Sequence, residues 1–216
     1  KRVRFDLNIQ SLGSLGGLVA LQRGECHLAG CHLLDPRTGD YNLPYLKRYF
    51  PNRDMVLLNL VNREQGLLVK KGNPLQIDGL RDLIQKGATY CNRQRGAGTR
   101  ALLDYLLQQE GLNPEQLKGY GKEEYTHIAA ALAVASGSAD AALGIKAAAS
   151  AMELDFIPLA EERYDLALPS ELLSDDRLVI LRELISSKEF KMGVKELGGY
   201  RTEKSGELLR QNGVEK

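Results

Sequence analysis

Apolar residues recur along the chain with two different spacings, which predict strands and helices in alternation. Residues 3–11 alternate apolar and polar side chains, and residues 88–93 and 139–145 form short apolar runs, as strands do. Residues 100–112 carry apolar side chains at i, i+3 and i+4, and residues 126–137 continue as a second helix. Strands that alternate with helices predict an α/β fold with mostly parallel sheets, flanked by helices on both faces.

Longer apolar segments interrupted by polar residues complete the pattern. Residues 55–74 hold two apolar runs joined by a polar stretch, and residues 155–160 and 164–169 are predicted as two separate strands. The carboxylates at positions 161–162 belong to the charge run between those strands, which is typical of a solvated face. Residues 176–200 predict a pair of terminal helices.

The stretch NRQRGAGTRALLDYLL, residues 92–107, joins a predicted strand to a helix through a glycine-rich turn. Glycines allow a sharp bend that exposes backbone N–H groups, and Thr99 is predicted to cap the helix. The first N–H groups of a helix and its dipole favour an anion, and Arg93, Arg95 and Arg100 add positive charge. Two interpretations stay open from these residues alone: an anion site, or a capped helix whose arginines lie in solvent.

Ligands of open α/β sheets bind beyond the carboxyl ends of the strands, where helices begin. The turns before Leu15, Leu102 and Ile128 meet that description, and each offers small or hydroxyl side chains. We expect the three turns to converge on an oxyanion. The residues that they place there are Ser11, Ser14, Arg95, Gly96, Ala97, Gly98, Thr99, Tyr125, Thr126 and His127.

Composition narrows the class of protein. The 216 residues are 43% hydrophobic and 26% charged, as in ordinary globular proteins, and the net charge of +1 provides no field for nucleic acid or an acidic membrane. No apolar run approaches the roughly 20 residues that span a bilayer, and the charged first residues do not form a signal peptide. We therefore expect a cytoplasmic domain that contacts neither nucleic acid nor a membrane.

The cysteines do not predict a disulfide framework, because there are three of them, and an odd count fits a reducing cytoplasm. Cys26, His27, Cys31 and His32 lie close together in the sequence. They belong to a predicted strand, on which neighbouring side chains point to opposite faces, so they do not converge as a tetrahedral metal site. No metal site is predicted.

The chain shows no convincing catalytic set. Ser14 lies in GSLG, which lacks the glycine that precedes the serine of a nucleophile elbow by two positions. His127 and Asp140 are available as base and acid, but no spacing relates them to that serine. The motif RGAGTR lacks the Gly-Lys-Ser/Thr ending of a phosphate-binding P-loop. We predict neither an enzyme nor a resident cofactor.

Four segments together resemble the PBP-like domain of the periplasmic-binding-protein superfamily. They are residues 11–45 (SLGSLGGLVALQRGECHLAGCHLLDPRTGDYNLPY), 92–107, 123–145 (EEYTHIAAALAVASGSADAALGI) and 154–169 (LDFIPLAEERYDLALP). The resemblance extends from about Leu7 to Tyr200. Such cytoplasmic domains are fused to helix-turn-helix DNA-binding domains or to the molybdopterin-biosynthesis protein MoeA. Their relatives include molybdate-binding proteins and the effector domains of LysR-type regulators.

The resemblance implies the type II binding-protein fold, in which two α/β lobes are joined by crossing strands and the ligand lies in the cleft between them. Residues 1–68 together with 165–216 would form lobe I, and residues 69–164 would form lobe II. Members of this fold begin with a strand, a loop and a helix ahead of the segment that matches residues 5–11. The resemblance therefore implies that this first β-α unit is missing from the chain.

The function implied is that of a non-catalytic sensor domain that binds a small oxyanion, molybdate or tungstate, with sulfate or phosphate as surrogates. It would serve molybdenum cofactor biosynthesis or molybdate-responsive regulation, with a fused helix-turn-helix or molybdopterin-biosynthesis domain as its partner. The alternative is a LysR-type domain for a small organic carboxylate, which a guanidinium pairs with through two hydrogen bonds. Three further residues stay open between the ligand and a structural role or solvent: Arg93, His32 and Lys146.

Overall fold

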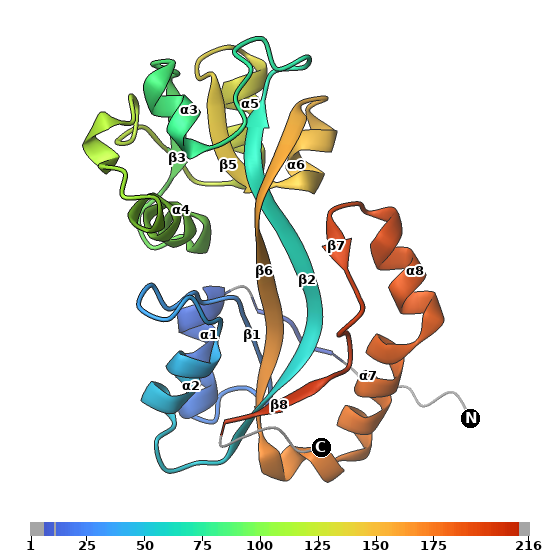
Figure 1. Ribbon diagram of the computed structural model, residues 1–216. Coiled ribbons are helices and arrows are strands. Elements are labelled where there is room, and N and C mark those ends of the chain that lie inside the picture. The colour runs from blue at the N-terminus through green and yellow to red at the C-terminus, as the bar shows by residue number, and fades with distance from the viewer. Residues whose placement is uncertain (1–6, 11, 212–216) are drawn as a thin grey trace.

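Two long strands dominate the computed structural model, which describes residues 7–10 and 12–211. Strand β2 (Met55–Val69) and strand β6 (Asp155–Pro169) pair antiparallel along their whole length and run between two groups of elements (Figure 1). Both apolar ends of β2 and the last residues of β6 are buried in the two groups, residues 155–160 of β6 are only partly buried, and the polar middles lie between the groups. The polar stretches within 55–74 and 155–169 therefore do not end a strand. They lie where the strands pass from one group to the other.

The remaining elements are distributed between these two groups, which we call lobe I and lobe II (Figure 1). Lobe I contains α1 (Gly13–Gln22), β1 (Ala29–Cys31), α2 (Leu43–Tyr49), η2 (Ser170–Ser174), α7 (Asp176–Ser186), α8 (Lys188–Glu196), β7 (Tyr200–Arg201) and β8 (Leu208–Arg210). Lobe II contains α3 (Leu80–Gln85), β3 (Tyr90–Arg93), α4 (Gly98–Gln109), η1 (Pro114–Gln116), β4 (Glu123–Glu124), α5 (His127–Ala135), β5 (Ala141–Ile145) and α6 (Lys146–Ala151).

Each lobe is built on its own apolar core. In lobe II, Leu83, Leu103 and Leu143 pack in one cluster, and the small side chains of α5 and α6 pack in another on the other side of β5. In lobe I, Leu18 and Leu46 pack on one face of the sheet, and the apolar residues of α7 cover the other. The predicted helices over 100–112, 126–137 and 176–200 are confirmed, and Thr126 caps α5 by accepting a hydrogen bond from the Ala129 N–H at 2.9 Å.

The sheet is mixed in its described part, whereas the alternation of elements predicted mostly parallel pairing. The order is β1-β6-β2-β5-β3-β4, with β7 and β8 also pairing with β2. Only β3 pairs in parallel, with β4 and β5, and the other pairs are antiparallel. The antiparallel excess arises because β2 and β6 each serve both lobes and pair with each other. The α/β class and the type II architecture are nevertheless confirmed.

The strand predicted over residues 3–11 is not found in its described part, residues 7–10, which form no regular structure. Leu7 and Ile9 are exposed there, so the alternating pattern is not accompanied by burial of the apolar side chains. The lobe boundaries after residues 68 and 164 stay predictions, since each falls inside a continuous strand.

The pairing of β2 with β6 is irregular at two points that flank the polar middle of β2. The register shifts between Asn59 and Val61 and again between Gln65 and Gly66. At the second point a Cβ on Gly66 would overlap the carbonyl of Ile157, so only glycine allows this close approach.

Candidate functional site

A buried carboxylate lies at the centre of the junction between the lobes. Glu162 on β6 stands opposite Arg63 on β2, and its side chain is only 3% exposed. Its Oε1 lies 2.7 Å from Nη2 of Arg63 and 2.7 Å from Nδ1 of His32, while Oε2 accepts a hydrogen bond from Gln65. Burial would raise the pKa of this carboxyl, but the hydrogen bond from His32 and the charge of Arg63 outweigh it and lower the pKa to about 2. Glu162 is therefore ionised at neutral pH.

His32 brings lobe I to this carboxylate. It directly follows β1, its ring stacks on Tyr164 with 5.2 Å between centroids, and its backbone N–H donates to Oγ of Ser14 at 3.3 Å. Ser14 is the second residue of α1, as the sequence predicted for a helix that starts at the cleft. The guanidinium of Arg63 also lies over the Tyr164 ring, 5.3 Å from the ring centroid.

Lobe II meets His32 at the start of α4. A Cβ on Gly98 would lie 3.0 Å from Nδ1 of His32, so the missing side chain lets the lobes approach closely. The next residue, Thr99, is hydrogen bonded to Gln65 at 3.4 Å and does not cap α4, whose N-cap residue is Ala97. The cap predicted for Thr99 is wrong because this buried hydroxyl points to β2. His32, Glu162, Gln65 and Thr99 thus form a continuous polar contact from lobe I to lobe II.

Two arginines and a histidine crowd the lobe II side of the same junction. Arg93, at the end of β3, donates to the backbone carbonyls of Tyr125 at 2.9 Å and Glu124 at 3.2 Å. Burial, followed by the nearby charge of Arg63, lowers the pKa of Arg93. Burial, Arg93 and Arg63, in that order, lower the pKa of His127 to about 3, so His127 is neutral.

Arg63, Arg93 and His127 have hydrogen-bonding nitrogens whose capacity is not fully used. Nε of Arg63 and Nδ1 of His127 are buried without a hydrogen-bond partner among the described residues. Arg93 has carbonyl partners but no carboxylate partner in that part of the chain. Crowded positive groups and unpaired buried nitrogens are costly in a closed protein, and an anion would satisfy both.

The structure brings six of the predicted residues to this junction: Ser14, His32, Arg93, Gly98, Thr99 and His127. Thr126 lies beside them, but its hydroxyl is occupied as the cap of α5. Tyr125 contributes its carbonyl to Arg93, while the residue as a whole is 73% exposed. Ser11 lies outside the described residues.

The tip of the glycine-rich turn points away from the junction. The side chain of Arg95 is 91% exposed, and its Nε lies 3.9 Å from Glu123. Gly96 has a positive φ of 86°, and Ala97 closes the turn through its N–H to the carbonyl of Gln94. Lys146 lies beside Gly199, where a side chain on the glycine would meet the Cβ of Lys146. Its Nζ is 4.0 Å from Glu64. Ligand contacts of these four residues stay predictions.

The residues that sequence reasoning missed are Arg63, Gln65 and Glu162. Their signal was the polar interruption of two long apolar runs, NREQ in 62–65 and EER in 161–163. The interpretation of 161–162 as a solvated charge run fits Glu161, whose side chain is 42% exposed, and is wrong for Glu162. Because strand side chains alternate, one glutamate of the pair faces inward.

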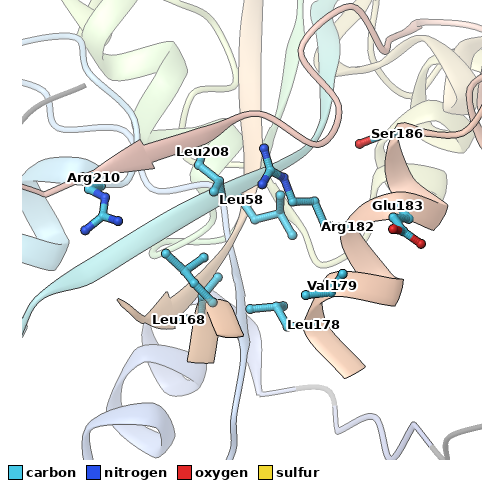
Figure 2. Close-up of a pocket in the computed structure, with 10 residues that line it drawn as sticks. Leu58, Leu168, Leu178, Val179, Arg182, Glu183, Ser186, Leu208 and Arg210 are labelled. Carbon is cyan, nitrogen blue, oxygen red and sulfur yellow. The ribbon is translucent and has the colours of Figure 1, made fainter. Parts of the chain in front are cut away.

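A hollow of about 510 Å³ lies elsewhere, in lobe I between α7 and strands β2, β6 and β8 (Figure 2). Leucines such as Leu58, Leu168 and Leu178 form its walls, and Arg182 extends over them with its Nε donating to the carbonyl of Gly206 at 3.0 Å. It has no set of converging polar groups like the junction. Among residues 7–10 and 12–211, no helix is long and apolar enough to cross a bilayer, and no three His, Cys, Asp or Glu side chains gather to hold a metal ion.

Comparisons with known proteins give the fold a family context. A model of the PBP superfamily domain matches residues 2–186. The uncharacterized protein YvgK of Bacillus subtilis is 39% identical over 197 residues, which are 91% of this chain and 63% of that protein, so the chain spans less than two thirds of that relative.

Solved structures resemble the chain in fold. The substrate-binding domain of a putative molybdenum ABC transporter from Clostridium difficile aligns with a TM-score of 0.61 at 14% identity, covering 93% of this chain and 86% of that one. The arginine-, lysine-, histidine-binding protein ArtJ from Geobacillus stearothermophilus aligns with a TM-score of 0.54 at 20% identity, covering 91% and 80%.

Proposed function

Because the chain belongs to the PBP superfamily domain family, we propose that its two lobes close on a small anionic ligand at the junction around Arg63, Arg93 and His127. The observation that carries this proposal is the surplus of donors and positive charge in that group. Two buried nitrogens lack partners, and Arg93 has no carboxylate partner among the described residues. No catalytic role is proposed, since binding domains of this family work by closing on a ligand.

A tetrahedral oxyanion, molybdate or tungstate, is the ligand that we propose first. Neutral donors surround the charged group: the Ser14 hydroxyl, the Thr99 hydroxyl and the first N–H groups of α4 and α5. The molybdenum ABC transporter domain that shares the fold supports the same class of ligand. A cytoplasmic role in molybdenum cofactor biosynthesis or molybdate-responsive regulation, through a fused helix-turn-helix or MoeA-type domain, is part of the proposal.

A small organic carboxylate is the second candidate, and Arg93 is the observation that favours it. Its guanidinium is held at the junction by two backbone carbonyls, so its orientation is fixed. A fixed guanidinium can pair a planar carboxylate through two parallel hydrogen bonds. The amino-acid-binding protein ArtJ, which shares the fold, supports this alternative.

Isothermal titration calorimetry with molybdate, tungstate, phosphate, sulfate and a panel of small carboxylates separates the two candidates. We expect a single site for one of the two classes, and loss of that binding in Arg93→Gln. Arg182→Gln is the matched control, because it removes the same charge from the wall of the lobe I hollow. Absence of heat for every anion, with the protein folded, would overturn the proposal.

Closure is the step through which binding would be signalled to a fused domain. The ligand stabilises the closed arrangement, so its binding energy shifts the population of closed molecules. Small-angle X-ray scattering should record a smaller radius of gyration when a binding anion is added. An unchanged radius at saturation would mean that the domain binds its ligand without closing.

A further inference from the structure

The junction already holds an anion that belongs to the protein itself. The carboxylate of Glu162 accepts hydrogen bonds from Arg63 and Gln65 of the crossing strand β2 and lies 2.7 Å from Nδ1 of His32 of lobe I. Through Gln65 it is connected to Thr99 at the start of α4. One of these groups, Arg63, is also a member of the anion site proposed above.

We propose that Glu162 is a resident competitor of the ligand, which pairs with Arg63 of the anion site and sets how tightly, and which, anions bind. The inference rests on the anion site proposed above. An incoming anion either displaces this carboxylate from Arg63 and His32 or binds beside it. In both cases a full negative charge that is nearly inaccessible to water opposes binding.

The charge of Glu162 also makes the site discriminate among anions by their charge and their hydrogen-bond donors. Repulsion by a fixed carboxylate grows with the charge of the ligand, so dianions such as molybdate and sulfate suffer more than monoanions. A ligand that carries a hydrogen-bond donor, such as a hydrogen phosphate ion, can donate to Glu162 in place of His32. We therefore expect removal of the charge at position 162 to favour the dianions most.

Glu162→Gln removes the charge and keeps nearly the same shape, which makes it the variant to test. We expect its affinity for molybdate and sulfate to rise by roughly tenfold or more, since the substitution removes a buried like charge beside the anion. The affinity for phosphate should rise less. Calorimetry at a constant ionic strength measures all three anions.

Glu161→Gln is the matched control. The adjacent glutamate carries the same charge, but its side chain is 42% exposed and pairs with Arg201 of β7. We expect less than a twofold change of anion affinity in this variant. Glu162→Asp is the second variant, for the case that Glu162→Gln does not fold. It keeps the charge near Arg63 but withdraws it from His32, and a smaller rise in affinity is expected.

The outcomes separate this inference from the proposed function. Wild type that binds an anion while folded variants at position 162 bind it equally or more weakly would overturn the competitor and leave the anion site standing. Weaker binding of a ligand with an ammonium group in Glu162→Gln would also overturn it, because Glu162 would then contact the ligand. If neither wild type nor the variants bind any anion, both proposals fail. Binding by Glu162→Gln alone would support the competitor and overturn anion binding as the function of the wild type.

Discussion

Two regions carry the arginines of the lobe junction, and they differ in what surrounds them. The glycine-rich turn presents Arg95 to solvent with a distant carboxylate at 3.9 Å, whereas the middle of β2 and the end of β3 hold Arg63 and Arg93 among buried partners. The turn has a recognisable local motif, and the two strand segments have none. The comparison shows that a motif locates a helix start, while the charges that interact strongly are selected by burial.

The largest expected effect is on stability, from Arg63→Gln. The substitution leaves the buried carboxylate of Glu162 without its guanidinium, and breaking a buried pair in this way costs about 3–5 kcal/mol of unfolding free energy. Urea denaturation measures the loss. Arg201→Gln removes an arginine that is 56% exposed and also pairs with glutamates, so less than about 1 kcal/mol should be lost there. Equal losses would mean that burial does not determine how strongly these arginines stabilise the fold.

The next effect is on anion affinity, from a comparison of two arginines that are two residues apart. Arg93→Gln should weaken binding of the anion identified by calorimetry roughly ten- to a hundredfold, as expected for a lost charge-assisted hydrogen bond. Arg95→Ala should weaken it less than about threefold, because an exposed side chain interacts through screened charge only. A loss of similar size in Arg95→Ala would show that the turn folds over the ligand, as its motif predicted.

A smaller effect concerns pH and His127. The groups that face His127 are Arg93, Arg63, Glu162 and His32, and burial is the main cause of its pKa of about 3. Since the unfolded chain binds the proton at an ordinary pKa near 6.5, stability is complete above that value and is lost as the pH falls toward 3.

His127→Asn should remove about 1 kcal/mol of the stability loss that wild type shows between pH 6 and pH 5. Urea denaturation at both pH values, in buffers without phosphate, gives the difference. His27→Asn, at an exposed position, is the control and should retain the wild-type dependence. The same slope in His127→Asn as in wild type would contradict the assignment of this pH dependence to the junction.

The smallest effect is expected from a single methyl group at the lobe contact. Gly98→Ala adds a Cβ that would lie 3.0 Å from Nδ1 of His32. His32 must therefore move by a few tenths of an ångström. We expect anion affinity to fall by about two- to threefold, and further in the bulkier Gly98→Val. Gly193→Ala adds a methyl group to open space on α8 and should leave the affinity unchanged.

Much of the fold could be predicted from the sequence, because helices such as α4 and α5 have a local periodicity and local end signals. The turns that begin α1, α4 and α5 were also found in this way, and they do meet at the junction. What could not be predicted was the pairing of β2 with β6, which is a contact between residues about a hundred positions apart. When that pairing is not known, the sequence does not distinguish Arg63 and Glu162 from the other residues of their two polar stretches.

The same limit explains the two local errors. The hydroxyl of Thr99 was assigned to the helix end that lies beside it in the chain, but a side chain from β2 offers it a buried partner. The strand over residues 3–11 was inferred from alternation alone, and alternation stabilises a strand only when a neighbouring strand pairs with it. The described residues 7–10 have no such neighbour.

The register shift at Gly66 has a consequence for how the chain reaches its folded state. Glu161 and Glu162 are chemically identical, so sliding β6 by one position along β2 would turn a different glutamate inward and still offer Arg63 a carboxylate. Side-chain chemistry thus leaves two competing alignments nearly degenerate at this point. The backbone irregularity, which requires the absence of a side chain at residue 66, discriminates between them. We expect a larger residue there to weaken this discrimination and to slow the pairing of β2 with β6.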